Sequence, residues 1–155
     1  MILSFLSIPT DIAEAYRNGK TDAHGKRPER QPASTGTGTP CRHCLRQVPA
    51  DHPYLVLAHK PFKGSNPYCE LGPIFLCAEQ CDAAAASFPD AILTAEQYIV
   101  RGYSSDERIL YGTGRVVATV DIAAYCQQLL TDTNVDFVHI RSASNNCFLC
   151  RVERN

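Results

Sequence analysis

The chain has 155 residues, of which 45% are hydrophobic and 20% are charged, and its formal net charge is −1. This balance excludes a general nucleic-acid binder, which needs a basic surplus. The length suits a single domain, residues 1–155, with a substantial core. The apolar start lacks basic residues and runs into Asp11 and Glu14. No apolar run approaches the ~20 residues of a membrane helix, so we expect a cytoplasmic protein that does not contact membranes.

The first 40 residues predict one strand, one helix and a long loop. Leu3–Ile8 is apolar enough for a strand, and Thr10 is placed to cap a helix that Gly19 ends. The stretch 20–40 has almost no large apolar side chain and includes a run of alternating Thr and Gly. This composition predicts a flexible loop within the domain.

Short apolar runs follow, and they predict a succession of strands: Tyr54–His59, Pro73–Cys77, Gln97–Tyr103, Arg108–Tyr111 and Val116–Val120. Asp121 starts a second predicted helix, which continues to Leu130 with apolar residues at helical spacing. Val135–Ser142 and Cys147–Arg154 flank a short turn and predict a C-terminal β-hairpin. We therefore predict an α+β fold with a mainly antiparallel β-sheet and two main helices.

Two C-x-x-C pairs stand out among the eight cysteines, Cys41/Cys44 and Cys147/Cys150. Such pairs are typical of zinc sites or of thiol-redox chemistry. If the pairs met, their four sulfurs would form a metal site, and the protein would be a zinc-stabilised structural or interaction module. In a strand, however, Cys147 and Cys150 point to opposite faces, which disfavours this set.

A second alternative is a thiol-redox protein that acts through Cys41 and Cys44. Arg42 and His43 lie between the two thiols and would favour the reactive thiolate. A thioredoxin-like dithiol follows a strand and opens a helix, whereas this pair follows the Gly/Thr loop. The local sequence context therefore disfavours the redox interpretation.

The predicted hairpin also suggests cross-strand pairs. A turn centred between Ser144 and Asn145 places His139 opposite Cys150, Arg141 opposite Phe148 and Phe137 opposite Val152. Cys77 and Cys81, near the end of a predicted strand, would complete a mixed His/Cys site with His139 and Cys150. The alternative is that His139 is an ordinary buried histidine among apolar neighbours.

Several short motifs occur in a recognisable order: Pro40-Cys41-Arg42, Pro67-Tyr68, Gly72 to Phe75, Arg101 to Tyr103, and Asn146 to Phe148 followed by Arg151 to Arg154. In this order the chain resembles a bacterial domain-of-unknown-function family, number 1203, from about Pro40 onwards and in the opening strand and helix. That family has no assigned activity. The resemblance carries over to Cys41, Arg42, Tyr68, Phe75, Arg101, Tyr103, Cys147, Arg151 and Arg154. It implies that Cys41 and Cys147 are the cysteines of interest, as packed thiols or as a redox-sensitive couple.

Arginines within or beside apolar strands need anionic partners when they are buried. One interpretation is internal salt bridges to Glu70, Glu79 or Glu153. The other is a pocket for a small anionic ligand, and it gives our leading prediction: a small-molecule binding or undefined enzymatic domain with an Arg/Tyr-lined pocket near Cys41 and Cys147. The candidate ligand-binding residues are Cys41, Arg42, Tyr68, Arg101, Tyr103, His139, Arg141, Cys147 and Arg151. This prediction involves no cofactor, and the residues indicate neither a reaction nor an oligomeric state.

Overall fold

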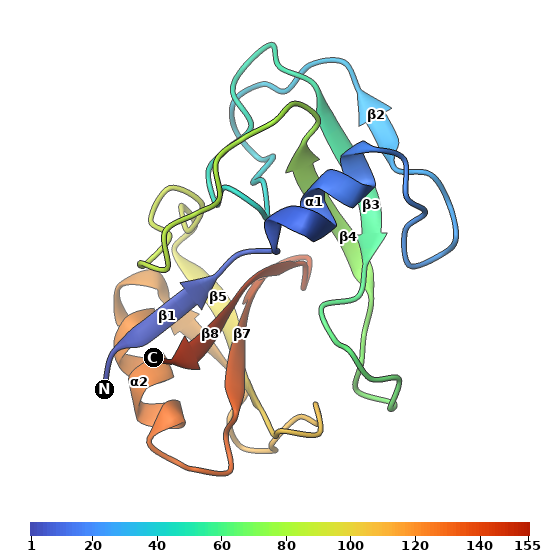
Figure 1. The fold of residues 1–155 in the computed structure, drawn as a ribbon. Coiled ribbons are helices and arrows are strands. Elements are labelled where there is room, and N and C mark those ends of the chain that lie inside the picture. The colour runs from blue at the N-terminus through green and yellow to red at the C-terminus, as the bar shows by residue number, and fades with distance from the viewer.

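Two antiparallel sheets, each covered by one helix, make up the computed structural model, which describes residues 1–155 (Figure 1). The larger sheet has the order β1-β8-β7-β5-β6, with β1 Leu3–Leu6, β5 Gln97–Tyr103, β6 Arg115–Ala118, β7 Phe137–Ser142 and β8 Phe148–Arg154. The smaller sheet has the order β2-β3-β4, with β2 Glu29–Gln31, β3 Tyr54–His59 and β4 Gly72–Cys77. The helices are α1 Thr10–Arg17 and α2 Ile122–Leu130, with a 3-10 turn at Thr119–Asp121. The predicted α+β class is confirmed.

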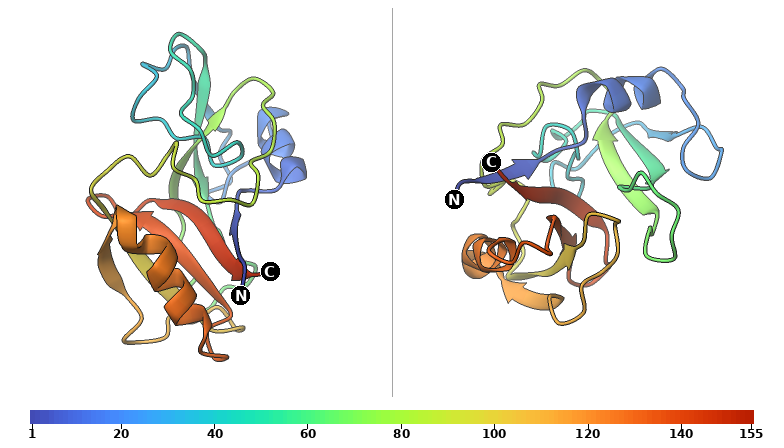
Figure 2. Two further views of the ribbon diagram at one scale, coloured as in Figure 1. Left: turned by 90° about the vertical axis from the view of Figure 1, so that its left-hand side faces the viewer. Right: turned by 60° about the horizontal axis from the view of Figure 1, so that its bottom comes forward.

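Helix α2 packs on one face of the five-stranded sheet. Its buried residues are Ile122, Tyr125, Cys126 and Leu130, at the spacing that brings one helical face to a core. Strand β5 supplies Tyr98 and Val100 to the same core. Each fully buried aliphatic side chain contributes about 1.5–3 kcal/mol relative to exposure, so this cluster is the main stabilising core. Figure 2 shows α2 on the side of this sheet away from the three-stranded sheet.

Helix α1 packs against the three-stranded sheet. Strand β3 alternates so that Leu55 and Leu57 are buried, and α1 contributes Ala13 and Tyr16 to the same cluster. The predicted capping role of Thr10 is wrong, because no side chain caps this helix and the Thr10 hydroxyl is instead 2.9 Å from Nε2 of His43. Neither helix is long and apolar enough to cross a membrane.

Backbone pairing gives structure to part of the stretch 20–40. Strand β2 pairs with β3, with Glu29 opposite Val56. The Asp22 carboxylate accepts hydrogen bonds from the backbone N–H groups of Ala58 and Lys26, each at 3.0 Å. Neither the strand pairing nor the hydrogen bonds to Asp22 involve apolar side chains, so the hydrophobic pattern of the sequence does not predict them.

The β7–β8 hairpin contains a bulge that shifts the predicted register. Arg141 lies opposite Phe148 as predicted, but Ile140 is the partner of Cys150, which leaves Leu149 unpaired. His139 therefore faces Arg151, and the predicted His139–Cys150 pair is wrong, as is the predicted pairing of Phe137 with Val152. The predicted strand Arg108–Tyr111 is also absent, because only Ile109 makes an isolated bridge, to Tyr103.

Candidate functional site

Four cysteine sulfurs converge at one end of the three-stranded sheet. The Sγ atoms of Cys41, Cys44, Cys77 and Cys81 all lie within 4.8 Å of one another. The Cys41 and Cys81 sulfurs are 3.9 Å apart. A tetrahedral zinc ion with Zn–S bonds of about 2.3 Å holds its sulfurs about 3.8 Å apart, so this cluster has the size and the ligand type of a four-thiolate zinc site.

A tight turn brings the first two sulfurs to one side. The Cys41 N–H donates to the carbonyl of Arg46 at 2.9 Å, and the Leu45 N–H donates to the carbonyl of Cys41 at 3.0 Å. Leu45 closes the turn in the left-handed region, at φ +51°. Cys41 also forms a parallel bridge with Phe75 of β4, which places it beside the end of that strand.

The second pair of sulfurs comes from the end of β4 and the segment after it. Cys77 is the last residue of β4, and its N–H donates to Sγ of Cys41 at 3.2 Å. Cys81 lies four residues further on. The Ala84 N–H donates to the carbonyl of His43 at 3.1 Å and fixes this segment over the turn. The cluster thus joins a turn, a strand end and the segment that leads towards the other sheet.

A layer of polar side chains surrounds the Cys81 sulfur. Nη2 of Arg17 donates to it at 3.0 Å, and Nδ1 of His43 is 3.1 Å away. The Thr10 hydroxyl bonds to the other ring nitrogen of His43, so that Nδ1 is oriented towards the sulfur. A zinc ion held by four thiolates would carry a net charge of −2, and the Arg17 guanidinium would offset part of it.

The four thiols cannot all ionise without a cation. The pKa of the Cys41 thiol is strongly lowered, because Cys44, Cys77 and Cys81 all stabilise its thiolate through hydrogen bonds. The pKa values of Cys77 and Cys81 are raised, first by their bonds to Cys41, since each retains the proton that it donates. A divalent metal would remove this conflict by stabilising all four thiolates together.

The predicted metal set is therefore wrong in its second pair. Cys147 and Cys150 are not part of the cluster, and neither is His139, so the mixed His/Cys site is wrong as well. Cys150 is fully buried in the α2 core, where burial raises its pKa. The Cys147 thiol donates to the carbonyl of Asn145 at 3.7 Å. All eight cysteines are free thiols, and the sulfur neighbours of Cys41 are the three other members of the cluster.

A second group of functional side chains lies on the five-stranded sheet, on the face away from α2. Arg101 of β5 and Arg141 of β7 both approach the carboxylate of Glu70. The distances are 3.4 Å from Nη2 of Arg101 and 3.9 Å from Nη1 of Arg141. The Arg141 side chain is 5% exposed and that of Arg101 is 16% exposed, whereas that of Glu70 is 38% exposed. The predicted internal salt bridges to Glu70 are present in this pair.

The guanidinium groups of Arg101 and Arg141 have more N–H donors than the neighbouring groups have acceptors for them. Nε and Nη2 of both guanidinium groups are buried without a hydrogen-bond partner, and so is the hydroxyl of Tyr103. The approach of Arg101 to Glu70 is an ion pair that lacks hydrogen-bond geometry. Burying such donors unpaired is costly, so an acceptor that reached them would be bound favourably.

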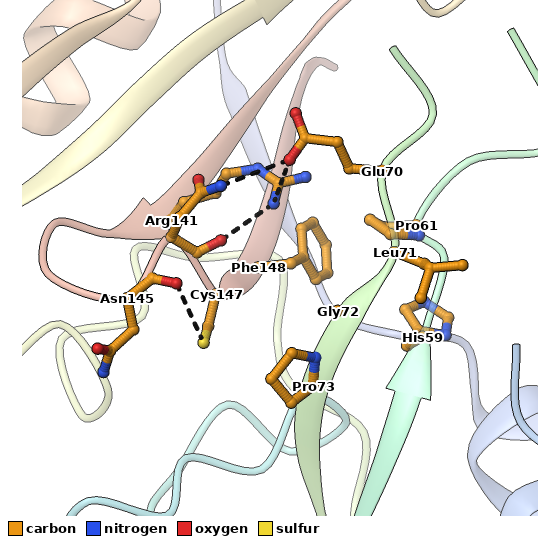
Figure 3. Close-up of a pocket in the computed structure, with 11 residues that line it drawn as sticks. His59, Pro61, Glu70, Leu71, Gly72, Pro73, Arg141, Asn145, Cys147 and Phe148 are labelled. Atoms are coloured by element: carbon orange, nitrogen blue, oxygen red, sulfur yellow. Dashed lines mark hydrogen bonds and ion pairs between the residues drawn. The ribbon is translucent and has the colours of Figure 1, made fainter. Parts of the chain in front are cut away.

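A small cavity of about 140 Å³ lies beside Arg141 and Glu70. Asn145, Asn146, Cys147 and Phe148 line it from the β7–β8 hairpin, and the smaller sheet and the segment between its strands β3 and β4 contribute His59, Pro61 and Pro73 (Figure 3). The Asn146 amide donates to Glu70 at 3.4 Å. We call this cavity, together with Glu70 and the two arginines that contact it, the arginine pocket; Arg141 lines the cavity itself, whereas Arg101 and Tyr103 do not.

The other predicted ligand-binding residues lie elsewhere. Tyr68 bonds through its hydroxyl to that of Tyr111, at 2.9 Å, on an exposed surface. Arg151 stacks on the ring of Phe137, 3.5 Å from its centroid. Arg42 is buried and joins the cysteine turn to β8, because its Nε donates to the carbonyl of Phe148 at 2.7 Å.

His139 is fully buried beneath the arginines. Its ring lies 4.8–5.1 Å, centroid to centroid, from four aromatic rings, those of Phe62, Tyr103, Phe137 and Phe148. Burial and then the charge of Arg141 lower its pKa well below the usual value, so the ring is neutral. Neither ring nitrogen has a hydrogen-bond partner. His139 is a core residue of this face.

Sequence reasoning missed the partnership of the Cys77/Cys81 pair with Cys41 and Cys44. The available signal was a C-x3-C spacing at the end of a predicted strand. It also missed Arg17, and it connected His43 with Cys41 and Cys44 rather than with Cys81, the sulfur that both side chains contact.

Comparison with known proteins gives a family and nothing more specific. No curated protein and no solved structure matches the chain. A family model described as "Protein of unknown function (DUF1203)" matches residues 38–154, which include all four clustered cysteines and both arginines of the pocket. The chain therefore belongs to the DUF1203 family, as its motifs predicted.

Proposed function

We propose that the protein binds one zinc ion through Cys41, Cys44, Cys77 and Cys81 and that the ion stabilises the fold. The observation that carries this proposal is the convergence of four sulfurs within 4.8 Å. Four thiolates fill a tetrahedral shell and leave no position for water or substrate, which is typical of structural rather than catalytic zinc. Thiolate ligands in tetrahedral geometry also favour zinc over harder cations.

The same geometry disfavours a redox dithiol at Cys41 and Cys44. Two further sulfurs, those of Cys77 and Cys81, lie within 4.8 Å of both of them. The side chains that approach from outside, Arg17 and His43, contact Cys81 and not the Cys41/Cys44 pair. A thiol-disulfide reagent would therefore meet a metal-ligand set, with no isolated reactive thiol.

Metal analysis of the purified protein tests the zinc proposal. We expect about one zinc per chain in the wild type and its loss in Cys44→Ser and Cys81→Ser. Cys147→Ser, which removes a thiol outside the cluster, serves as the matched control and retains the zinc. Removal of the metal by a chelator should lower the melting temperature, because the binding free energy of structural zinc contributes to folding. Protein that is free of metal after expression with zinc, and equally stable with or without chelator, would contradict the proposal.

A second function rests on the arginine pocket: we propose that it binds a small anion. The supporting observation is that Arg141, which lines the cavity, and Arg101 both contact the partly exposed Glu70 carboxylate and keep buried donors without acceptors. Paired guanidinium groups bind carboxylate and phosphate oxygens through charge-assisted hydrogen bonds. Of the two cysteines that the leading sequence prediction placed near the pocket, Cys147 lines it, whereas Cys41 belongs to the cysteine cluster.

NMR titration of the zinc-loaded protein with acetate or inorganic phosphate tests this second proposal. We expect saturable shifts of the Asn145 and Asn146 side-chain amides and a roughly tenfold or greater loss of affinity in Arg141→Gln, because Arg141 lines the cavity and a hydrogen bond to a charged group is worth about 1.5–3 kcal/mol. Arg151→Gln removes the same charge from outside the pocket and should have little effect. Equal losses in both variants would show a general charge effect and would count against the pocket.

A further inference from the structure

We infer that Glu70 is a built-in occupant of the arginine pocket and that the pocket's ligand is a small carboxylic acid that displaces the Glu70 side chain. This inference rests on the anion-binding function proposed for the pocket. It adds the chemical class of the ligand and a competition with the chain's own carboxylate.

Glu70 is a loose partner for the two arginines. Its contacts with Arg101, Arg141 and Asn146 are 3.4, 3.9 and 3.4 Å long, at or beyond the upper limit of a hydrogen bond. The guanidinium groups are buried, whereas the Glu70 side chain is 38% exposed at the rim. Glu70 therefore covers the arginines without satisfying them, and four guanidinium nitrogens stay unbonded.

The charges around the pocket favour a second anion. Arg101 and Arg141 carry two positive charges, and Glu70 is the one carboxylate in ion-pair contact with them. Two histidines nearby do not add charge, because burial lowers the pKa of His59 to about 4 and that of His139 well below the usual value. The site thus has a surplus of one positive charge while Glu70 is in place, and of two when Glu70 turns away.

Displacement of Glu70 requires little change in the backbone. The preceding segment is held independently, because the Glu107 carboxylate accepts hydrogen bonds from the N–H groups of Lys63 and Gly64, at 2.8 and 2.6 Å. Glu70 follows this anchored part, and one residue, Leu71, separates it from β4. Its partly exposed side chain can rotate into solvent while the walls of the pocket stay in place.

The size and lining of the pocket define the class of ligand. Its volume of about 140 Å³ is well below the ~300–1,000 Å³ of pockets for drug-sized molecules, so it suits a small acid. A carboxylate would reproduce the group that Glu70 already offers to the same donors. Pro61, Pro73 and Phe148 form an apolar wall that suits a short hydrocarbon remainder and offers nothing to a fully hydrated anion.

The test measures binding of propionate and of inorganic phosphate to zinc-loaded wild type, Glu70→Gln and Glu153→Gln by NMR titration. If Glu70 occupies the pocket about nine-tenths of the time, its removal raises the apparent affinity for propionate about tenfold. Glu153→Gln removes an equal charge, which in the wild type pairs with Arg151 outside the pocket, and should leave the affinity unchanged. Zinc content and melting temperature establish that each variant is folded.

Each other outcome overturns a defined part of the inference. Equal propionate affinity in wild type and Glu70→Gln would leave the anion pocket standing and refute its occupation by Glu70. An equal gain in Glu153→Gln would reduce the effect to general electrostatics and refute the competition. Tighter binding of phosphate than of propionate would refute the carboxylate class. Absence of saturable binding of either probe in both wild type and Glu70→Gln would refute the pocket itself.

Discussion

Two buried histidines lie where the two sheets meet, and both are neutral in the fold. Nδ1 of His59 is hydrogen-bonded to the Tyr16 hydroxyl at 3.2 Å. The centroid of the His59 ring lies 6.4 Å from that of the Phe148 ring. Burial, with a smaller contribution from Arg42, lowers the pKa of His59 to about 4. Stability at this junction therefore depends on keeping an imidazole uncharged.

We expect the free energy of unfolding to fall as the pH drops from about 6.5 to about 4. In the unfolded chain, His59 binds a proton once the pH falls below its ordinary pKa of ~6.5, whereas in the folded chain it does so only near pH 4. Protonation of His59 at low pH therefore lowers the free energy of unfolding by about 3 kcal/mol. His59→Gln keeps an acceptor for Tyr16 and should lose this part of the pH dependence. Urea unfolding of both proteins at a series of pH values, with equal zinc, measures it. Parallel curves for the two proteins would contradict the assignment.

Helix α1 connects the opening strand to the cysteine cluster. Its last residue, Arg17, donates to Sγ of Cys81 and, through Nε, to the carbonyl of Cys77 at 2.9 Å. The packing of Ala13 and Tyr16 on the three-stranded sheet positions this arginine. The helix thus supports the four-cysteine cluster as well as forming part of the core.

Arg17→Met should weaken zinc binding by about tenfold without abolishing it, because partners of metal ligands typically change affinity by 10–100-fold. Competition with a chromophoric zinc chelator measures the change. Arg46→Met is the matched control, since Arg46 is exposed beside the same turn. Equal affinities for Arg17→Met and wild type would show that the contact with Cys81 has no role in holding the metal.

The elements that the sequence predicted well are those with a periodic apolar pattern. The bounds of β3 and β5 agree with the predicted strands, and α2 presents the predicted apolar face. The bulge at Leu149 escaped prediction, because an extra residue in one strand changes the register without changing the alternation that is visible locally. Strand β2 escaped it too, since its three side chains are all exposed and it forms through backbone pairing alone.

The two candidate sites differ in how far the sequence could define them. Cys41 and Cys44 were identified by their spacing, but their partners depend on the parallel bridge between Cys41 and Phe75, a contact between segments 34 residues apart. The pairing of Arg101 and Arg141 with Glu70 was anticipated as one of several salt bridges. The sequence did not predict that these arginines would have donors without acceptors, because this depends on side-chain geometry.

The eight thiols should separate into three classes of reactivity across the whole molecule. Cys69 and Cys147 are partly exposed and outside the cluster, and they should be alkylated first. The four clustered cysteines should react only after chelation of zinc. Cys126 and Cys150 should react only after unfolding, since they are buried and burial raises their pKa, to about 12 for Cys126. Mass spectrometry of alkylated peptides gives the order, and rapid alkylation of Cys81 in untreated protein would contradict the metal site.

The pairing of β1 with β8 has a consequence for the order of folding. Leu3 lies opposite Arg154, so the edge of the larger sheet joins the earliest and the latest strands of the chain. On the ribosome, β1 has no partner until residue 154 has emerged. The smaller sheet and all four clustered cysteines are complete by residue 81, so the lobe that contains the cysteine cluster can assemble first and hold α1 in place while the partner of β1 is still being synthesised.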